Sequence, residues 1–166
     1  MTDRVFYRAL RPEWSFAPLS GEGAKKNGGR WNPKGQAALY LAGDPMTAIA
    51  EYNQDFYFRP VTLVEYQVDN ARLADLSDPL FRKTHDIHDD DLATAWRAEA
   101  LSRKTPRSWT VAAALMADGY HGALFLSRIN QAPSLVLWRW NDESGCTVEV
   151  QDFDQRLPRD STSWRP

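Results

Sequence analysis

Residues 28–54 read GGRWNPKGQAALYLAGDPMTAIAEYNQ, and this stretch predicts a loop, a strand and a helix in close succession. The apolar run at residues 38–42 is short, which is typical of a buried strand. Asp44 and Pro45 follow it as a helix N-cap and a first helical residue, so we expect a helix that runs to about Gln54. A long glycine-bearing loop, residues 20–35, leads into the strand.

The rest of the chain adds strands and helices in irregular order around this stretch. Hydropathy predicts further strands at residues 5–9, 61–68, 123–126, 135–140 and 146–150, and helices at 91–102 and 108–117. The Asp-rich residues 75–91 read as a solvated connection, and the tail after Asp154 reads as a surface segment. Strands and helices without regular alternation predict an α+β domain with a mixed, mainly antiparallel sheet and flanking helices.

The length of 166 residues predicts one domain, residues 1–166, with a motif-bearing core at about 5–142 and a C-terminal extension at 143–166. Lys and Arg total 20 against 22 Asp and Glu, a net charge of −2, which argues against a protein held on nucleic acid by phosphate contacts. Hydrophobic residues make up 43% of the chain, so a disordered chain is excluded. The 20 basic residues comprise 15 Arg and only 5 Lys, and Arg suits fixed, bidentate contacts to anions.

Cysteine content and apolar runs indicate the compartment. Cys146 stands alone, so neither an intrachain disulfide nor a Cys-based zinc site is expected. The N-terminus has no apolar signal-peptide core, and no apolar run approaches the ~20 residues of a membrane span. We therefore expect a cytoplasmic protein without a membrane partner.

The glycine loop matches no standard phosphate-binding motif. Gly21 and Gly23 are followed next by Gly28, so the G-x-G-x-x-G spacing of dinucleotide-binding folds fails. Gly28 is followed by Gly29 and Arg30, so the P-loop pattern fails too. Glycine spacing alone favours a flexible connection. Even so, paired glycines allow close backbone approach to a ligand, and the Arg30 guanidinium can bind phosphate oxygens in a fork.

Four segments together resemble the RES domain family, which takes its name from an Arg, a Glu and a Ser. They are Gly28-Gly29-Arg30-Trp31-Asn32, Leu39-Tyr40-Leu41-Ala42, Ala48-Ile49-Ala50-Glu51 and Phe125-Leu126-Ser127-Arg128. Tyr40 lies ten residues after Arg30, Glu51 lies eleven further on, and Ser127 comes late in the chain. Weaker similarity extends the resemblance over about residues 5–142.

This resemblance implies an ADP-ribosyltransferase-like fold and a bacterial toxin of a toxin–antitoxin pair that consumes NAD as its substrate. Some family members degrade NAD by hydrolysis or phosphorolysis, and one branch transfers ADP-ribose to a phosphoribosyl pyrophosphate synthetase. The implied partner is an Xre-like helix-turn-helix antitoxin that covers the active site. No metal and no direct nucleic-acid contact are implied.

Cleavage of the nicotinamide–ribose bond resembles glycoside cleavage, in which positive charge develops on the sugar and a carboxylate stabilises it. Glu51 is the candidate catalytic carboxylate, although composition alone would make it an ordinary solvated helix residue. Arg30 is the candidate for the pyrophosphate or a ribose, and a surface salt bridge is its alternative. Tyr40 is the candidate for stacking on or positioning the substrate, with core packing as its alternative.

Two further residues are candidate substrate contacts. Ser127 ends an apolar strand, so its hydroxyl could bind the substrate or orient Glu51, and a turn serine is its alternative. Arg8, on the first strand, is a second candidate phosphate ligand.

Other signals are weaker. Residues 85–91, HDIHDDD, contain metal-ligand types but read as a solvated stretch, and the absence of G-x-S-x-G argues against a serine hydrolase. Two other function classes stay open: a non-catalytic module that binds NAD or ADP-ribose, and an interaction domain that docks a partner through Trp14 and Trp164.

Overall fold

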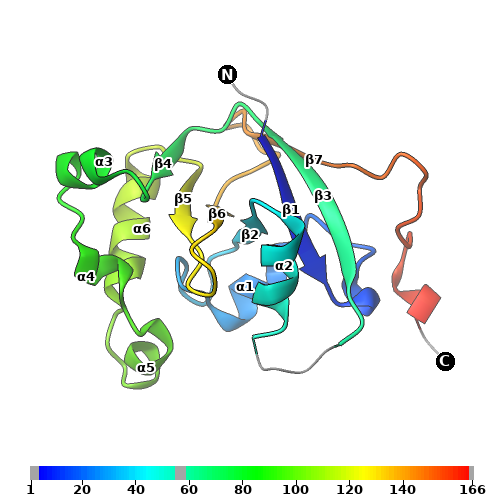
Figure 1. The fold of residues 1–166 in the computed structure, drawn as a ribbon, viewed down its shortest axis with the longest axis horizontal. Coiled ribbons are helices and arrows are strands. Elements are labelled where there is room, and N and C mark those ends of the chain that lie inside the picture. The colour runs from blue at the N-terminus through cyan, green and yellow to red at the C-terminus, as the bar shows by residue number, and fades with distance from the viewer. Residues whose placement is uncertain (1–3, 55–58, 165–166) are drawn as a thin grey trace.

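The computed structural model describes residues 4–54 and 59–164, and within this part seven strands form one mixed sheet (Figure 1). The order across the sheet is β4-β5-β6-β2-β1-β3-β7. Only the β4–β5 pair is parallel, and every other neighbouring pair is antiparallel. The strands are β1 (Arg4–Leu10), β2 (Leu39–Ala42), β3 (Thr62–Asp69), β4 (Leu73–Asp75), β5 (Gly122–Leu126), β6 (Pro133–Leu137) and β7 (Thr147–Val150).

The helices gather in two places around this sheet. α1 (Glu22–Asn27) and α2 (Pro45–Tyr52) lie in front of its middle, whereas α3 (Pro79–Thr84), α4 (Asp89–Leu92), α5 (Trp96–Leu101) and α6 (Arg107–Ala117) lie beside β4 and β5 (Figure 1). Two 3-10 helices, η1 (Pro12–Trp14) and η2 (Ser161–Trp164), pack against each other. The predicted α+β class with a mainly antiparallel sheet is confirmed.

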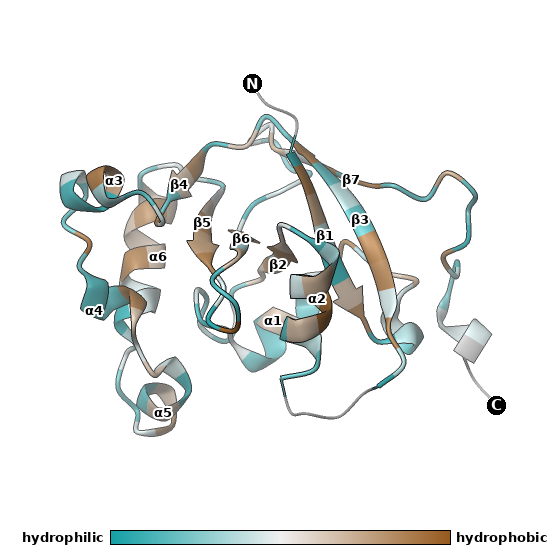
Figure 2. Cartoon of the chain, in the orientation of Figure 1, coloured by the Kyte–Doolittle hydropathy of each residue, from teal (hydrophilic) through white to brown (hydrophobic). Residues whose placement is uncertain are grey.

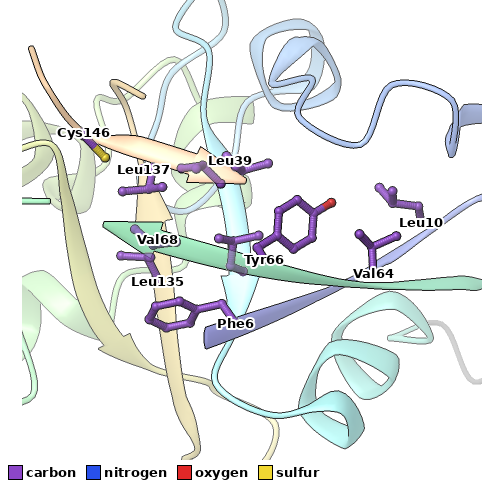
Figure 3. Packing of buried hydrophobic residues seen from close by; sticks show 11 residues of the cluster. Phe6, Leu10, Leu39, Val64, Tyr66, Val68, Leu135, Leu137 and Cys146 are labelled. Carbon is purple, nitrogen blue, oxygen red and sulfur yellow. The ribbon is translucent and has the colours of Figure 1, made fainter. Parts of the chain in front are cut away.

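Alternation along the central strands divides the apolar residues between the two faces of the sheet. Leu135 and Leu137 of β6 lie in one buried cluster, whereas Val136 between them lies in the other. The first cluster joins residues of five strands, and its buried members include Phe6, Leu39, Tyr66 and Leu137 (Figure 3). The second lies against α6. Hydropathy colouring shows apolar segments in the strands β2 and β5 and in parts of α2 and α6, whereas α4 is hydrophilic (Figure 2).

The predicted strands and two of the predicted helices are confirmed to within a few residues, and β6 ends at Leu137 rather than at residue 140. The strand expected in the C-terminal extension forms as β7, which pairs with β3 and so belongs to the sheet. The loop at 20–35 is wrong in one respect, because residues Glu22–Asn27 form α1.

The connection predicted for residues 75–91 is largely exposed to solvent, as expected, but it is not irregular, because it contains α3 and most of α4. Asp78 caps α3 by accepting a hydrogen bond from the backbone N–H of Leu80, and Pro79 occupies the first helical position. Asp44 and Pro45 give the same helix start signal for α2. At Asp78 and Pro79 the signal was obscured by the high aspartate content of the segment.

The helix predicted for residues 91–102 is interrupted, and α4 and α5 are separated by residues 93–95. A continuous helix would use the carbonyls of Leu92 and Thr94 as backbone acceptors. Here Arg30 Nη2 donates to Leu92 O at 2.5 Å and Arg128 Nη2 donates to Thr94 O at 2.7 Å. Tertiary contacts to two arginines therefore replace the helical bonds.

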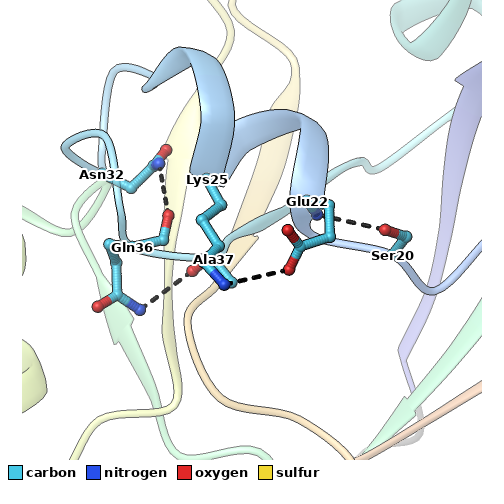
Figure 4. A network of polar contacts seen from close by, with 6 residues as sticks. All are labelled: Ser20, Glu22, Lys25, Asn32, Gln36 and Ala37. Atoms are coloured by element: carbon cyan, nitrogen blue, oxygen red, sulfur yellow. Dashed lines mark hydrogen bonds and ion pairs between the residues drawn. The ribbon is translucent and has the colours of Figure 1, made fainter.

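The turn at residues 28–32 is held to the sheet by buried hydrogen bonds. The Tyr40 hydroxyl accepts from the backbone N–H of Trp31 at 2.9 Å and donates to Asn32 Oδ1 at 2.7 Å. Asn32 Nδ2 donates to three backbone carbonyls, Gln36 O among them at 2.9 Å (Figure 4). Trp31 and Asn32 are completely buried.

Contacts from three distant residues complete the turn, two from α6 and one that directly follows β6. Trp109 Nε1 donates to Gly29 O at 2.8 Å, and Trp138 Nε1 donates to Trp31 O at 2.9 Å. Ser108 Oγ donates to Arg30 O at 2.6 Å. The carbonyls of Gly29, Arg30 and Trp31 thus each accept a hydrogen bond from a distant side chain, which fixes the backbone from which the Arg30 side chain leaves.

Gly29 is required in this turn because a Cβ there would overlap the Tyr40 hydroxyl and lie 2.6 Å from Asn32 Oδ1. We predict that Gly29→Ala lowers the free energy of unfolding by about 2 kcal/mol or more, since it separates the buried Tyr40–Asn32 pair. Gly23→Ala is the matched control, because nothing lies within 4 Å of its Cβ and it sits in α1, where alanine is favourable. Urea unfolding of both variants measures the difference, and equal stabilities would contradict the role given to this turn.

Candidate active site

Glu51 and Ser127, which are 76 residues apart, meet in a direct hydrogen bond. Ser127 Oγ donates to Glu51 Oε1 at 2.5 Å, and the serine is completely buried. Gln54 Nε2 donates to the other carboxylate oxygen at 2.5 Å. Both oxygens of Glu51 are therefore engaged by neutral donors, which fixes the plane of the carboxylate.

The position of Glu51 follows from α2, which Asp44 caps. Asp44 accepts from the Thr47 backbone N–H at 2.8 Å and from its hydroxyl at 2.6 Å, and these bonds lower the pKa of Asp44. Asn130, in the loop between β5 and β6, donates to Thr47 Oγ1 at 2.7 Å. This contact joins the start of α2 to the loop that follows Ser127, so the two parts of the Glu51–Ser127 pair are held together at a second point.

Arg30 lies next to the Glu51–Ser127 pair. Its Nη1 donates to the carbonyl of Leu126, next to Ser127, at 3.4 Å, and its Cζ lies 5.6 Å from the centre of the Phe125 ring. Burial, and to a lesser degree the positive charge of Arg128, lower the pKa of Arg30 to about 10, and Glu51 opposes the shift. The guanidinium is still cationic at neutral pH.

Tyr40 contributes to this site through the turn rather than through a free hydroxyl. Its hydroxyl is occupied by Trp31 N–H and Asn32 Oδ1, and burial raises its pKa. The structure therefore brings Arg30, Tyr40, Glu51 and Ser127 together, and it gives Tyr40 a positioning contact. Its predicted part in catalysis stays a prediction.

Arg8 does not lie with these residues, so the expectation that it lines the same site is wrong about its position. Tyr7 is opposite Ala42 in the β1–β2 pair, which puts Tyr7 on the Tyr40 face and Arg8 on the other face. Arg8 Nη1 donates to the carbonyls of Pro18 and Ser20, both at 3.2 Å, and burial lowers its pKa. Arg8 holds the segment after β1 against the sheet.

Sequence reasoning missed three residues of the site, namely Asn32, Gln54 and Arg128. Each is polar and lies within four residues of a predicted site residue, which is the signal that could have found it. Their contacts are with backbone atoms or with a neighbouring side chain, and sequence spacing does not reveal such contacts.

The described part of the chain, residues 4–54 and 59–164, contains no group of three or more His, Cys, Asp or Glu that could hold a metal ion. In the same part, no helix has the length and apolar character needed to cross a bilayer. Trp14, a candidate docking residue, is 58% exposed, and the side chain of Trp164 lies outside the described residues.

Comparison with known proteins connects this geometry to a family. A curated relative, "Toxin Res" of Yersinia enterocolitica serotype O:8 / biotype 1B, is 31% identical over 104 residues, which are 61% of this chain and 62% of that protein. The chain thus matches less than two thirds of the length of this relative. The structure of the M. tuberculosis MbcT–MbcA toxin–antitoxin complex contains a chain with the same fold, with a TM-score of 0.65 and 21% identity, covering 89% of this chain and 82% of that chain.

The RES domain model matches residues 5–160, which include Arg30, Glu51 and Ser127 and extend past β7. The match covers most of the chain and agrees with the resemblance found from the motifs. The chain belongs to the RES domain family.

Proposed function

We propose that this protein is the toxin of a toxin–antitoxin pair and that it cleaves the nicotinamide–ribose bond of NAD. The observation that carries the proposal is the Ser127–Glu51 hydrogen bond of 2.5 Å, since it fixes a carboxylate close enough to the Arg30 guanidinium to interact with its charge. NAD presents the matching pattern, because the ribose that becomes positive is linked through its 5′ oxygen to an anionic pyrophosphate.

Glu51 is the proposed catalytic residue. When the glycosidic bond breaks, its electron pair leaves with nicotinamide, which becomes neutral, and positive charge develops on the ribose. A carboxylate next to that ribose stabilises the charge. Ser127 and Gln54 hold the two carboxylate oxygens, so Glu51 does not have to reorient as the charge appears.

Arg30 is the proposed substrate-binding cation, and the turn around it is the reason that it can act as one. A guanidinium held by backbone contacts loses little conformational freedom when it binds an anion. Tyr40 supports this position through Trp31 and Asn32.

The acceptor of ADP-ribose is a protein side chain, phosphate or water. The first makes the protein a mono-ADP-ribosyltransferase, for which a phosphoribosyl pyrophosphate synthetase is the target implied by the resemblance. The second and third make it an NAD phosphorylase or glycohydrolase. All three share the bond-breaking step assigned to Glu51.

The proposed partner is an Xre-like antitoxin that covers the site. A fold neighbour of this chain is described in complex with an antitoxin. Near Ser127, Leu126 and Ile129 are 39% and 48% exposed, and they offer apolar surface at the rim of the site that a partner could bury.

We predict that the purified protein, freed of antitoxin, releases nicotinamide from NAD and that Glu51→Gln lowers the rate about 10²-fold or more. The matched control is Glu143→Gln, which removes the same charge from an exposed position. Nicotinamide release is measured by chromatography, and thermal unfolding shows whether each variant is folded.

Absence of nicotinamide release by the wild type would reject the enzyme and favour a module that only binds NAD or ADP-ribose. Release at the wild-type rate by Glu51→Gln would remove Glu51 from catalysis. Labelled NAD with cell extract and with phosphate then identifies the acceptor, because a labelled protein, a phosphorylated ADP-ribose and free ADP-ribose are separate products.

Expression in a bacterial host tests the toxin part of the proposal. We expect the wild type to arrest growth, Glu51→Gln to permit it, and Glu143→Gln to arrest it like the wild type. Colony counts after induction, with protein levels matched by immunoblot, measure this. Equal toxicity of wild type and Glu51→Gln would show that growth arrest does not come from the proposed chemistry.

A further inference from the structure

A pocket of about 340 Å³ is lined by Leu126 and Arg128, the chain neighbours of Ser127, and has three arginines in its wall. Arg82 is neutralised there, because its Nη2 lies 3.2 Å from Asp89 Oδ1 and its Nη1 donates to Leu76 O. Arg30 and Arg128 have no carboxylate within 4 Å among the described residues. The pocket therefore carries two guanidinium charges that no acidic group balances at contact distance.

These two arginines are held close to each other by one short segment. Arg30 Nη2 donates to Leu92 O at 2.5 Å, and Arg128 Nη2 donates to Thr94 O at 2.7 Å and lies 3.5 Å from the same Leu92 O. Neutral carbonyls thus fix two cations whose charges repel each other. The break between α4 and α5 leaves these carbonyls free of helical hydrogen bonds, so that they can accept from the two arginines.

Unpartnered polar atoms lie in the same region. Arg30 Nε is buried without a hydrogen-bond partner, and so is Oγ1 of Thr94, a residue that is 5% exposed. Burial and the charge of Arg128 both lower the pKa of Arg30, which indicates that its cation is poorly compensated. An anion between the two guanidinium groups would relieve the repulsion and supply the missing charge.

We propose that Arg128 and Arg30 together form a two-guanidinium subsite for the pyrophosphate of an ADP-ribose-containing ligand, with residues 92–94 as the backbone support that holds the pair. A pyrophosphate carries two neighbouring anionic groups, which matches two guanidinium groups that reach one carbonyl. The inference rests on the proposed function for the identity of the ligand. It assigns Arg128 to binding and leaves bond cleavage to Glu51.

The test measures binding of ADP-ribose and of inorganic pyrophosphate by calorimetry, because neither is cleaved at a nicotinamide bond. Arg128→Gln is expected to weaken both about 10-fold or more. Arg128→Lys keeps the charge but not the fork and is expected to recover only part of the affinity. Arg82→Gln removes one charge from the same pocket wall and is expected to change the affinity less than about twofold, since Arg82 is already paired with Asp89.

Equal weakening by Arg128→Gln and Arg82→Gln would overturn the subsite in favour of a general effect of pocket charge. Wild-type affinity in Arg128→Gln, or failure of the wild type to bind either ligand, would overturn it as well. Nicotinamide release by the wild type is recorded separately. Binding that depends on Arg128 without nicotinamide release would support the subsite and reject the proposed reaction, whereas release with affinity that does not depend on Arg128 would do the reverse.

Discussion

The hydroxyl of Tyr40 is the contact on which the rest of the site depends, because it ties the turn that carries Arg30 to the middle of the sheet. β2 lies between β6 and β1, so the hydroxyl projects from the most constrained part of the fold. Donating to Asn32 Oδ1 requires a protonated phenol, and burial raises the pKa of Tyr40 in the direction that keeps the proton, while the oxygen also accepts from Trp31 N–H. A residue expected to touch the substrate thus acts first on the backbone next to it.

The strands and the main site residues could be predicted because their signals are local or periodic. Alternation over residues 62–69 and the apolar runs at 122–126 and 133–137 identify strands without knowledge of the fold. The spacing of Arg30, Tyr40, Glu51 and Ser127 is long in sequence but specific to one family. The antiparallel β2–β6 pairing, in which Tyr40 is opposite Val136, places the strand of Tyr40 beside the one that returns from Ser127.

What the sequence did not reveal depends on contacts between distant segments. The uninterrupted apolar spacing of residues 91–102 favours one helix, and the structure divides it where two guanidinium groups donate to the carbonyls of Leu92 and Thr94. Arg8 shows a different limit. Neighbouring residues of a strand face opposite sides, so assigning a strand residue to a site requires knowledge of which face carries the site. Tyr7 and Arg8 differ by one position, and only Tyr7 lies on the Tyr40 face.

The place of Glu51 on its helix explains why it has so many partners. It lies one residue before the end of α2, where the partial negative charge of the helix disfavours a carboxylate. Ser127 and Gln54 donate to its two oxygens, and the cation of Arg30 interacts favourably with it. Because the helix end supplies no stabilisation of its own, the favourable contacts of Glu51 come from these three groups, and two of them belong to other parts of the fold. A change in the turn around Arg30 or in the strand end at Ser127 would therefore change the surroundings of the Glu51 carboxylate. For this reason the residues that define the family act as one unit rather than as independent contacts.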